Sequence, residues 1–264
     1  ALPISQIWVN TPDGILPFTP PATVQAINFA DAKDVQPVLN SGAYSDGTST
    51  YGFYQFDGGF GGVWDNGNNG TLDGWLEDID LSELVSGQPV YDLVVDLDGT
   101  AVTGYFATKL GAFKLDEADL TAGNTTVQEV FDSADFFSVD IDGDPAIITN
   151  LAIPFGGSDL YIGTPKGVVI IPKTTIGNFD VASGDLIELS KGLVTRQMAV
   201  GTNYRAILTD HLVLVQSGSD PYKAVPVYAG VSQNVSEIYL DNTNGVVVLV
   251  GDGGLSAFDI DSIP

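Results

Sequence analysis

Hydrophobic positions along the chain come in short runs broken by turn residues, and one arrangement recurs. Residues 160–172 (LYIGTPKGVVIIP) place β-branched and aromatic residues on both sides of Thr-Pro-Lys-Gly, which predicts two strands joined by a tight turn. Similar patterns occur in QIWVNTPDGILPF, YGFYQFDGGFGGVW, GYFATKLGAFKL, YRAILTDHLVLV and VVVLVGDGGLSAFDI. The predicted turns lie at Gly14, Gly59, Gly111, Gly167, His211 and Gly254, with His211 in the place of glycine.

The spacing of these turns indicates the architecture. Successive turns are 43 to 56 residues apart, and a hairpin repeated at about 40–50 residues is typical of a β-propeller, in which each repeat forms one small sheet. Residues 24–30 (VQAINFA) are a further strand candidate, and residues 74–85 fit one helical turn or an outer strand. No linker separates the repeats, so we expect one domain over residues 1–264.

The fold prediction is therefore all-β with negligible helix, as a single β-propeller of six blades. The first hairpin lacks a preceding strand, and the last lacks a following one. If the two termini pair in one blade, the chain would form five or seven blades instead.

Some repeats resemble known propeller sequences. Residues 251–264 (GDGGLSAFDIDSIP) and 211–230 (HLVLVQSGSDPYKAVPVYAG) are similar to the LVIVD-type propeller repeat, in which Gly-Leu precedes an apolar strand that ends in Asp. IWVNTPDGILPF and LYIGTPKGVVIIP resemble the repeat of regulator-type sensor propellers. The likeness departs from the pattern at YQFDGGFGGVW and at His211. It implies a propeller fold and says little about chemistry, because propellers host many functions.

The charge of the chain restricts its partners. Nine Lys and Arg stand against 34 Asp and Glu, a net charge of −25, and most of the acids are Asp, which favours turns and metal-binding loops. This charge argues against nucleic acid and anionic membranes as partners and favours cations, neutral glycans or basic proteins. No run of 18 apolar residues occurs, so we expect no membrane insertion.

Few residues are suited to catalysis. The chain has no Cys and a single His, His211, which lies beside Asp210 in a turn and is interpreted as a solvated turn residue. Arg196 and Arg205 are the only arginines, too few for the cluster of a sialidase-type site. A glycosidase needs only paired carboxylates, for which Glu188 and Glu237 are the best candidates.

Two Asp clusters have features of calcium loops. Residues 65–73 (DNGNNGTLD) offer acid, amide and hydroxyl oxygens in an order similar to an EF-hand loop, although Gly67 departs from it. Residues 140–144 (DIDGD) alternate Asp residues that can converge on one hard cation. We therefore predict at least one bound Ca²⁺, with residues 65–73 as the first candidate site and 140–144 as the second, and ordinary Asp-Gly turns are the alternative. The candidate ligands are Asp65, Asn69, Thr71, Asp73, Asp140, Asp142 and Asp144.

These observations favour a secreted or cell-surface propeller without enzymatic activity that acts as a binding or scaffold module, in part of a larger extracellular assembly. The alternative is a carboxylate-based glycan hydrolase or lyase on the same fold. The expected partner is a protein or a neutral glycan. Unpaired blade edges at the termini would also allow a homo-oligomer.

Overall fold

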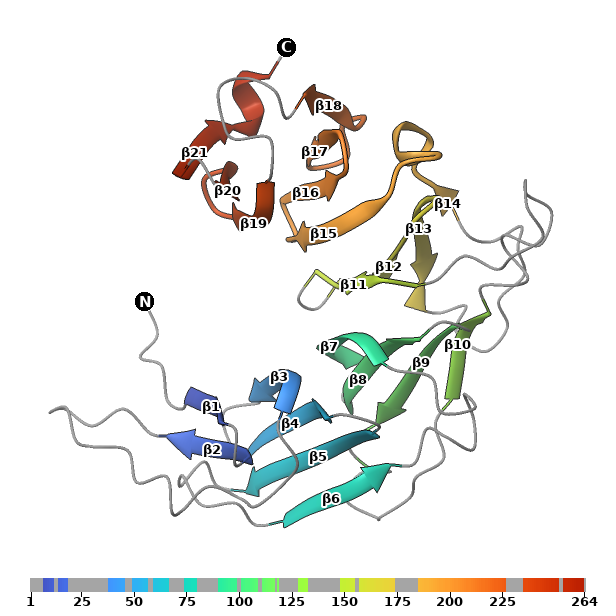
Figure 1. Ribbon diagram of the computed structural model, residues 1–264, viewed down its shortest axis with the longest axis vertical. Helices are drawn as coiled ribbons and strands as arrows, with labels where there is room; N and C mark the ends of the chain where they lie inside the picture. Colours follow the sequence, from blue (N-terminus) through green and yellow to red (C-terminus); the bar gives the residue numbers. More distant parts are fainter. Residues whose placement is uncertain are drawn as a thin grey trace, which may run out of the picture. The chain divides into compact units, whose positions relative to one another are not determined.

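The computed structural model is drawn in Figure 1. It describes residues 7–11, 14–18, 38–45, 49–56, 59–66, 74–79, 90–98, 101–108, 111–116, 118, 128–132, 148–154, 157–173, 185–226, 235–251 and 254–263. The chain divides into two compact units, residues 1–108 with 113–128, and residues 109–112 with 129–264. No helix in the described part of the chain is long and apolar enough to cross a membrane.

Antiparallel sheets built from consecutive strands make up the first half of the chain (Figure 1). Sheet 1 has two strands, and sheets 2 and 3 have four each. Sheet 1 contains β1 (Ile7–Thr11) and β2 (Gly14–Phe18). Sheet 2 contains β3 (Val38–Ser45), β4 (Ser49–Phe56), β5 (Gly59–Asn66) and β6 (Gly74–Ile79). Sheet 3 contains β7 (Val90–Asp98), β8 (Ala101–Thr108), β9 (Gly111–Asp116) and β10 (Gln128–Asp132).

The second half repeats this plan with sheets 4, 5 and 6, the last of which has three strands. Sheet 4 contains β11 (Asn150–Ala152), β12 (Asp159–Thr164), β13 (Gly167–Pro172) and β14 (Asp185–Leu186). Sheet 5 contains β15 (Thr195–Val200), β16 (Tyr204–Thr209), β17 (Leu212–Ser217) and β18 (Lys223–Pro226). Sheet 6 contains β19 (Val235–Asp241), β20 (Val246–Gly251) and β21 (Gly254–Asp259). Two 3₁₀ turns, η4 (Glu188–Ser190) and η5 (Ile260–Ser262), complete the described elements.

The prediction of an all-β fold with negligible helix is confirmed. Each predicted hairpin is observed as a strand pair, β1–β2, β4–β5, β8–β9, β12–β13, β16–β17 and β20–β21. The ambiguous stretch from residue 74 begins with a strand, β6, which pairs with β5, and residues 80–85 lie outside the described residues. The strand predicted at 24–30 lies outside them as well. The single domain and the number of blades stay predictions.

A buried threonine closes two of these hairpin turns in the same way. The Thr164 hydroxyl accepts a hydrogen bond from the Lys166 amide at 3.0 Å and donates one to the Gly167 carbonyl at 2.9 Å. The Thr209 hydroxyl accepts from the Leu212 amide and donates to the Leu212 carbonyl, each at 2.9 Å. Because the hydroxyl satisfies backbone groups that the two-residue loop leaves unpaired, each turn is fixed locally.

This comparison corrects the position of His211 in the repeat, while its interpretation as an exposed turn residue is confirmed. Gly167 follows the loop 165–166 and has φ +138°, a backbone conformation that favours glycine. In the β16–β17 hairpin the loop is Asp210-His211, so Leu212 holds the position that Gly167 holds in sheet 4. His211 is a loop residue, one position earlier than the repeat pattern placed it.

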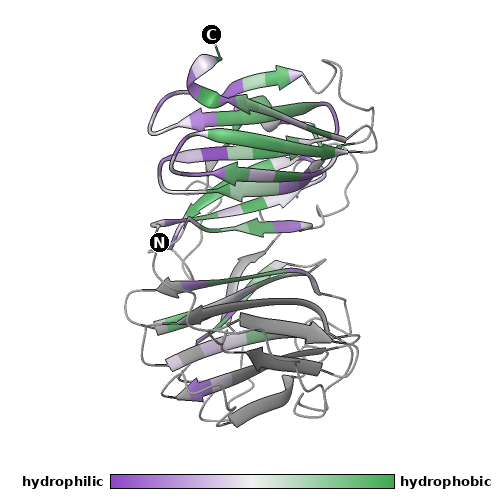
Figure 2. Ribbon diagram, turned by 90° about the vertical axis from the view of Figure 1, so that its left-hand side faces the viewer, coloured by the Kyte–Doolittle hydropathy of each residue, from purple (hydrophilic) through white to green (hydrophobic). Residues whose placement is uncertain are grey.

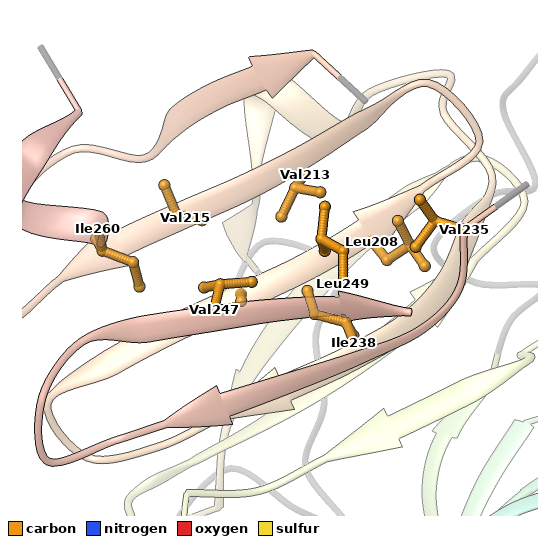
Figure 3. Packing of buried hydrophobic residues seen from close by; sticks show 9 residues of the cluster. Leu208, Val213, Val215, Val235, Ile238, Val247, Leu249 and Ile260 are labelled. Atoms are coloured by element: carbon orange, nitrogen blue, oxygen red, sulfur yellow. The ribbon is translucent and has the colours of Figure 1, made fainter. Parts of the chain in front are cut away.

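Sheet 5 is buried on both of its faces, because sheet 4 packs on one face and sheet 6 packs on the other. Successive residues of β16 face opposite ways: Ile207 packs toward sheet 4, and Leu208 packs toward sheet 6. Figure 3 shows the second contact, where Leu208, Val213 and Val215 meet side chains of sheet 6. Those side chains are Val235, Ile238, Val247 and Leu249, and Ile260 of η5 joins them. The strands of this unit are accordingly largely hydrophobic in Figure 2.

A polar contact also joins the ends of sheets 5 and 6. The Asn242 side-chain carbonyl accepts hydrogen bonds from the Asn203 amide at 2.9 Å and the Tyr204 amide at 3.0 Å. Its amide nitrogen donates to the Thr202 hydroxyl at 3.1 Å. A Cβ at Gly201 would lie 2.0 Å from the Asn242 Oδ1 atom, so only glycine fits at position 201 beside this side chain.

Candidate functional site

Of the predicted calcium ligands, the structure describes the side chain of Asp65. It lies in β5 opposite Thr50 and is fully buried. The other candidates, Asn69, Thr71, Asp73, Asp140, Asp142 and Asp144, lie outside the described residues. Within the described ranges no group of three or more His, Cys, Asp or Glu side chains could hold a metal ion. The calcium site therefore stays a prediction.

A row of polar side chains crosses sheet 3. Asp96 lies opposite Thr103 in the register of β7 and β8, and both side chains are buried. The Thr103 hydroxyl donates to Asp116 at 2.7 Å, and Lys114 lies 3.8 Å from the same carboxylate oxygen. Thr103 thus lies between two carboxylates on one face of a sheet. Because Asp116 satisfies the buried Thr103 hydroxyl and Lys114 offsets the charge of this partly exposed carboxylate, we interpret the row as a structural network.

The residues considered for catalysis are exposed. The His211 side chain is 64% exposed, and its Nε2 atom lies 3.3 Å from Asp210. Glu188 is exposed in η4, and Glu237 is exposed in β19, where it accepts a hydrogen bond from the Tyr239 hydroxyl. That bond raises the pKa of Tyr239 above its ordinary value. Glu188 lines an apolar cleft, but its side chain is exposed there, and Glu237 is exposed on sheet 6, so neither glutamate is enclosed in the apolar setting that a general acid requires.

An apolar cleft opens between sheets 4 and 5. Its volume is about 450 Å³, and it is lined by Ile170, Leu186, Ile187, Glu188, Leu189, Pro221 and Tyr222. Leu189 is 46% exposed. The Tyr222 hydroxyl is buried and has no hydrogen-bond partner in the structure, and burial raises the pKa of Tyr222. The cleft is in the size range of small-ligand sites, but nothing in the structure indicates what covers it.

After the cleft, the outer side of sheet 6 is the second candidate for a binding site. We use this name for the side chains that alternate with those packed on sheet 5: Glu237, Tyr239, Asp241, Val246, Val248, Val250, Leu255, Ala257 and Asp259. Tyr239 is 55% exposed and Leu255 is 74% exposed. Val246, Val248 and Val250 of β20 are partly buried between them. An apolar centre therefore lies among three exposed acids.

Local hydrogen bonds hold two of these acids in place. The Asp241 carboxylate accepts bonds from the amides of Thr243 and Asn244 and from the Asn244 side chain, at 2.9, 3.1 and 2.7 Å. Led by the Asn244 side chain, these bonds lower the pKa of Asp241. Asp259 accepts a bond from the Asp261 amide at 2.9 Å. Sequence patterns missed this surface, although the absence of Lys and Arg after Lys223 was visible in the sequence.

Comparisons with known proteins support the fold. No protein-family model matches the sequence, and no curated protein matches it significantly. The extracellular domain of the one-component system BT4673 from B. thetaiotaomicron is similar, with a TM-score of 0.56 and 14% identity over 96% of this chain and 31% of that chain. The β-propeller domain of Swd1 (Cps50) from Myceliophteria thermophila has a TM-score of 0.58 and 13% identity, over 97% and 80%.

A third similar structure is PorZ, a surface component of the type-IX secretion system of Porphyromonas gingivalis. Its TM-score is 0.50 and its identity 15%, over 84% of this chain and 27% of PorZ. The chain thus spans under a third of the BT4673 domain and of PorZ. At these identities the likeness shows an all-β fold shared with β-propeller domains. It does not confirm the LVIVD-type or regulator-type repeats.

Proposed function

We propose that this chain is a non-enzymatic binding module that recognises a partner protein outside the cell or at its surface. The observation that carries the proposal is the outer side of sheet 6. It exposes Leu255 at 74% and Tyr239 at 55% beside partly buried valines. Scattered apolar side chains are common on protein surfaces, but a contiguous group with a polar rim is typical of an interaction surface.

Charge and structural likeness support this function. A net charge of −25 favours a basic partner. The BT4673 domain is extracellular and PorZ is a surface component, which supports an extracellular location for this chain. The exposed positions of His211, Glu188 and Glu237 favour binding over catalysis.

The test is a binding screen of the full chain on peptide and neutral-glycan arrays, beside an assay for release of reducing sugar from the same glycans. We expect a basic peptide or protein ligand. Leu255→Asp should abolish its binding, because it places a charge in the apolar centre. The matched control is Leu189→Asp, which makes the same change at an exposed leucine of the cleft.

Three outcomes would contradict the proposal. Loss of binding with Leu189→Asp and not with Leu255→Asp would assign binding to the cleft. Glycan hydrolysis that is lost in Glu237→Gln or Glu188→Gln would establish the enzymatic alternative. A screen without any ligand would also refute a binding function.

A further inference from the structure

Sheet 6 has a strand edge that no described strand covers. Counted over the described strands, sheets 2 to 5 contain four each, whereas sheet 6 contains three. Its last strand, β21, pairs with β20 along its whole length, from Gly251 opposite Gly254 to Val246 opposite Asp259. Across the parts of the chain that the structure describes, nothing pairs with the other edge of β21. Exposed edges of this kind accept a further strand readily.

The residues that follow β21 do not fill this edge, because they are held against sheet 5. The Ile260 amide donates to the Gly245 carbonyl at 2.9 Å, and the Ile260 side chain is buried between sheets 5 and 6 (Figure 3). The Tyr204 hydroxyl donates to Asp261 at 2.8 Å, and the Lys223 ammonium donates to the Ile263 carbonyl. The contacts of Ile260, Asp261 and Ile263 therefore direct this segment away from the free edge of β21.

The pattern of hydrogen bonds identifies the backbone groups at the edge. In an antiparallel ladder, hydrogen-bonded pairs alternate with pairs that are not bonded. The Ile260 amide bonds to the Gly245 carbonyl, so these two residues form a hydrogen-bonded pair that continues the β20–β21 register. The next bonded pairs lie two residues further along each strand, at Val247 opposite Phe258 and Leu249 opposite Ser256. Residues 256 and 258 therefore bond to β20. The amides of Leu255, Ala257 and Asp259 and the carbonyls of Leu255 and Ala257 point to the edge, whereas the Asp259 carbonyl accepts a hydrogen bond from the Ser262 hydroxyl at 2.7 Å.

The side chains of the same three residues lie on the outer side of sheet 6, and all three are exposed. A strand added here would place its own alternate side chains beside Leu255, Ala257 and Asp259. The first two offer apolar contact, and the third offers a carboxylate. Glu237 and Asp241 add negative charge on the same side, and residues 224–264 contain no Lys or Arg. The electrostatic match is a basic segment.

We propose that the β21 edge binds an extended segment of a partner protein, which adds as a fourth strand with alternating apolar and basic side chains. This inference rests on the proposed binding function and names its site and partner class. Backbone hydrogen bonds supply affinity, and the alternate side chains supply specificity. A second copy of this chain would bring acids against acids, which weakens self-pairing.

The experiment measures fluorescence anisotropy of a short labelled peptide of alternating Val and Lys with the full chain. We expect saturable binding that weakens with added salt, and no binding of the matching Val–Glu peptide. Ala257→Pro removes one edge amide and keeps the bonds to β20, because the Ala257 amide points away from β20. Proline is tolerated at such positions on strand edges. It should weaken binding about tenfold or more.

A matched control is available in the neighbouring sheet. Pro226 lies opposite Leu212 in β18, and Ala224 lies two residues earlier, in the same phase of the ladder. Ala224→Pro therefore makes the same change on the edge strand of sheet 5, and we expect binding to be unchanged. Thermal unfolding of both variants checks that the fold is retained.

Several results would overturn the inference. These are equal binding of the two peptides, no binding of the Val–Lys peptide, or full binding by Ala257→Pro. Slow amide exchange at Leu255, Ala257 and Asp259 in the unbound chain would mean that the edge is already paired. Sizing would then distinguish a second copy from a segment of the same chain. If the ligand from the array screen is lost with Leu255→Asp and retained with Ala257→Pro, the binding function stands and strand addition fails.

Discussion

The contact of Asn242 with the turn at residues 201–204 allows a quantitative test of how sheets 5 and 6 are held together. Asn242→Ala removes two hydrogen bonds from backbone amides and one to Thr202. At about 0.5–1.5 kcal/mol for each bond, with water able to reach this partly exposed turn, we expect a loss of about 1–3 kcal/mol in the free energy of unfolding. Gly201→Ala should cost at least as much, because its Cβ would lie 2.0 Å from Asn242 Oδ1 and displace the side chain.

The double variant provides the sharper measurement. Both single changes remove the same bonds, so their costs should not add, and the double variant should lose about 1 kcal/mol less than their sum. Asn242→Ala relieves only part of the steric clash at position 201, because the Cβ of residue 242 would still lie 2.8 Å from the new Cβ. The assay is guanidinium unfolding followed by far-ultraviolet circular dichroism. The control is Thr243→Ala, which changes the exposed side chain next to Asn242, keeps the Thr243 backbone bond to Asp241, and should change stability by about 0.5 kcal/mol or less. Additive costs would refute the reasoning.

Three further predictions concern packing, turns and calcium. Ile207→Ala and Leu208→Ala should each lower the free energy of unfolding by about 2–5 kcal/mol, and a neutral result for either would contradict burial of sheet 5 on both faces. Thr209→Val should cost about 1–3 kcal/mol, measured by denaturant unfolding, and an unchanged midpoint would refute the role of its hydroxyl in the turn. Excess chelator should lower the melting temperature and Ca²⁺ should raise it, with the difference reduced in Asp142→Ala. An unchanged melting temperature in chelator would rule out the calcium loops. Because Asp65 is fully buried, Asp65→Ala would also disturb packing and is the weaker variant.

Local patterns in the sequence predicted the hairpins because turn chemistry and β-branched residues act over a few positions. Thr164-Pro-Lys-Gly167 encodes the turn, and the β-branched and aromatic residues on either side of it encode the two strands. The pattern failed by one residue at His211, because the Thr209 hydroxyl builds the same turn without glycine. A repeat aligned on glycine does not contain that information.

The surfaces between and outside the sheets could not be predicted in this way. Val247 and Val248 are adjacent and alike in sequence, but one is buried against sheet 5 and the other faces outward. Which face meets a neighbour depends on contacts between residues far apart in the chain. The exposed edge of β21 likewise depends on Ile260, whose packing on sheet 5 is not visible in a local pattern.

Building each sheet from consecutive strands also has a consequence for the order of folding. The loop between β12 and β13 contains two residues, as does the loop between β16 and β17, so closing these hairpins costs little chain entropy. The side-chain bonds between sheets 5 and 6 join residues that are 38 to 57 positions apart. We therefore expect hairpins to form on the microsecond scale typical of local pairing, and the sheets to dock afterwards through slower, non-local contacts. During that interval sheet 5 would present two apolar faces to water. We therefore expect the chain to be most prone to aggregation before sheets 4 and 6 have docked on sheet 5.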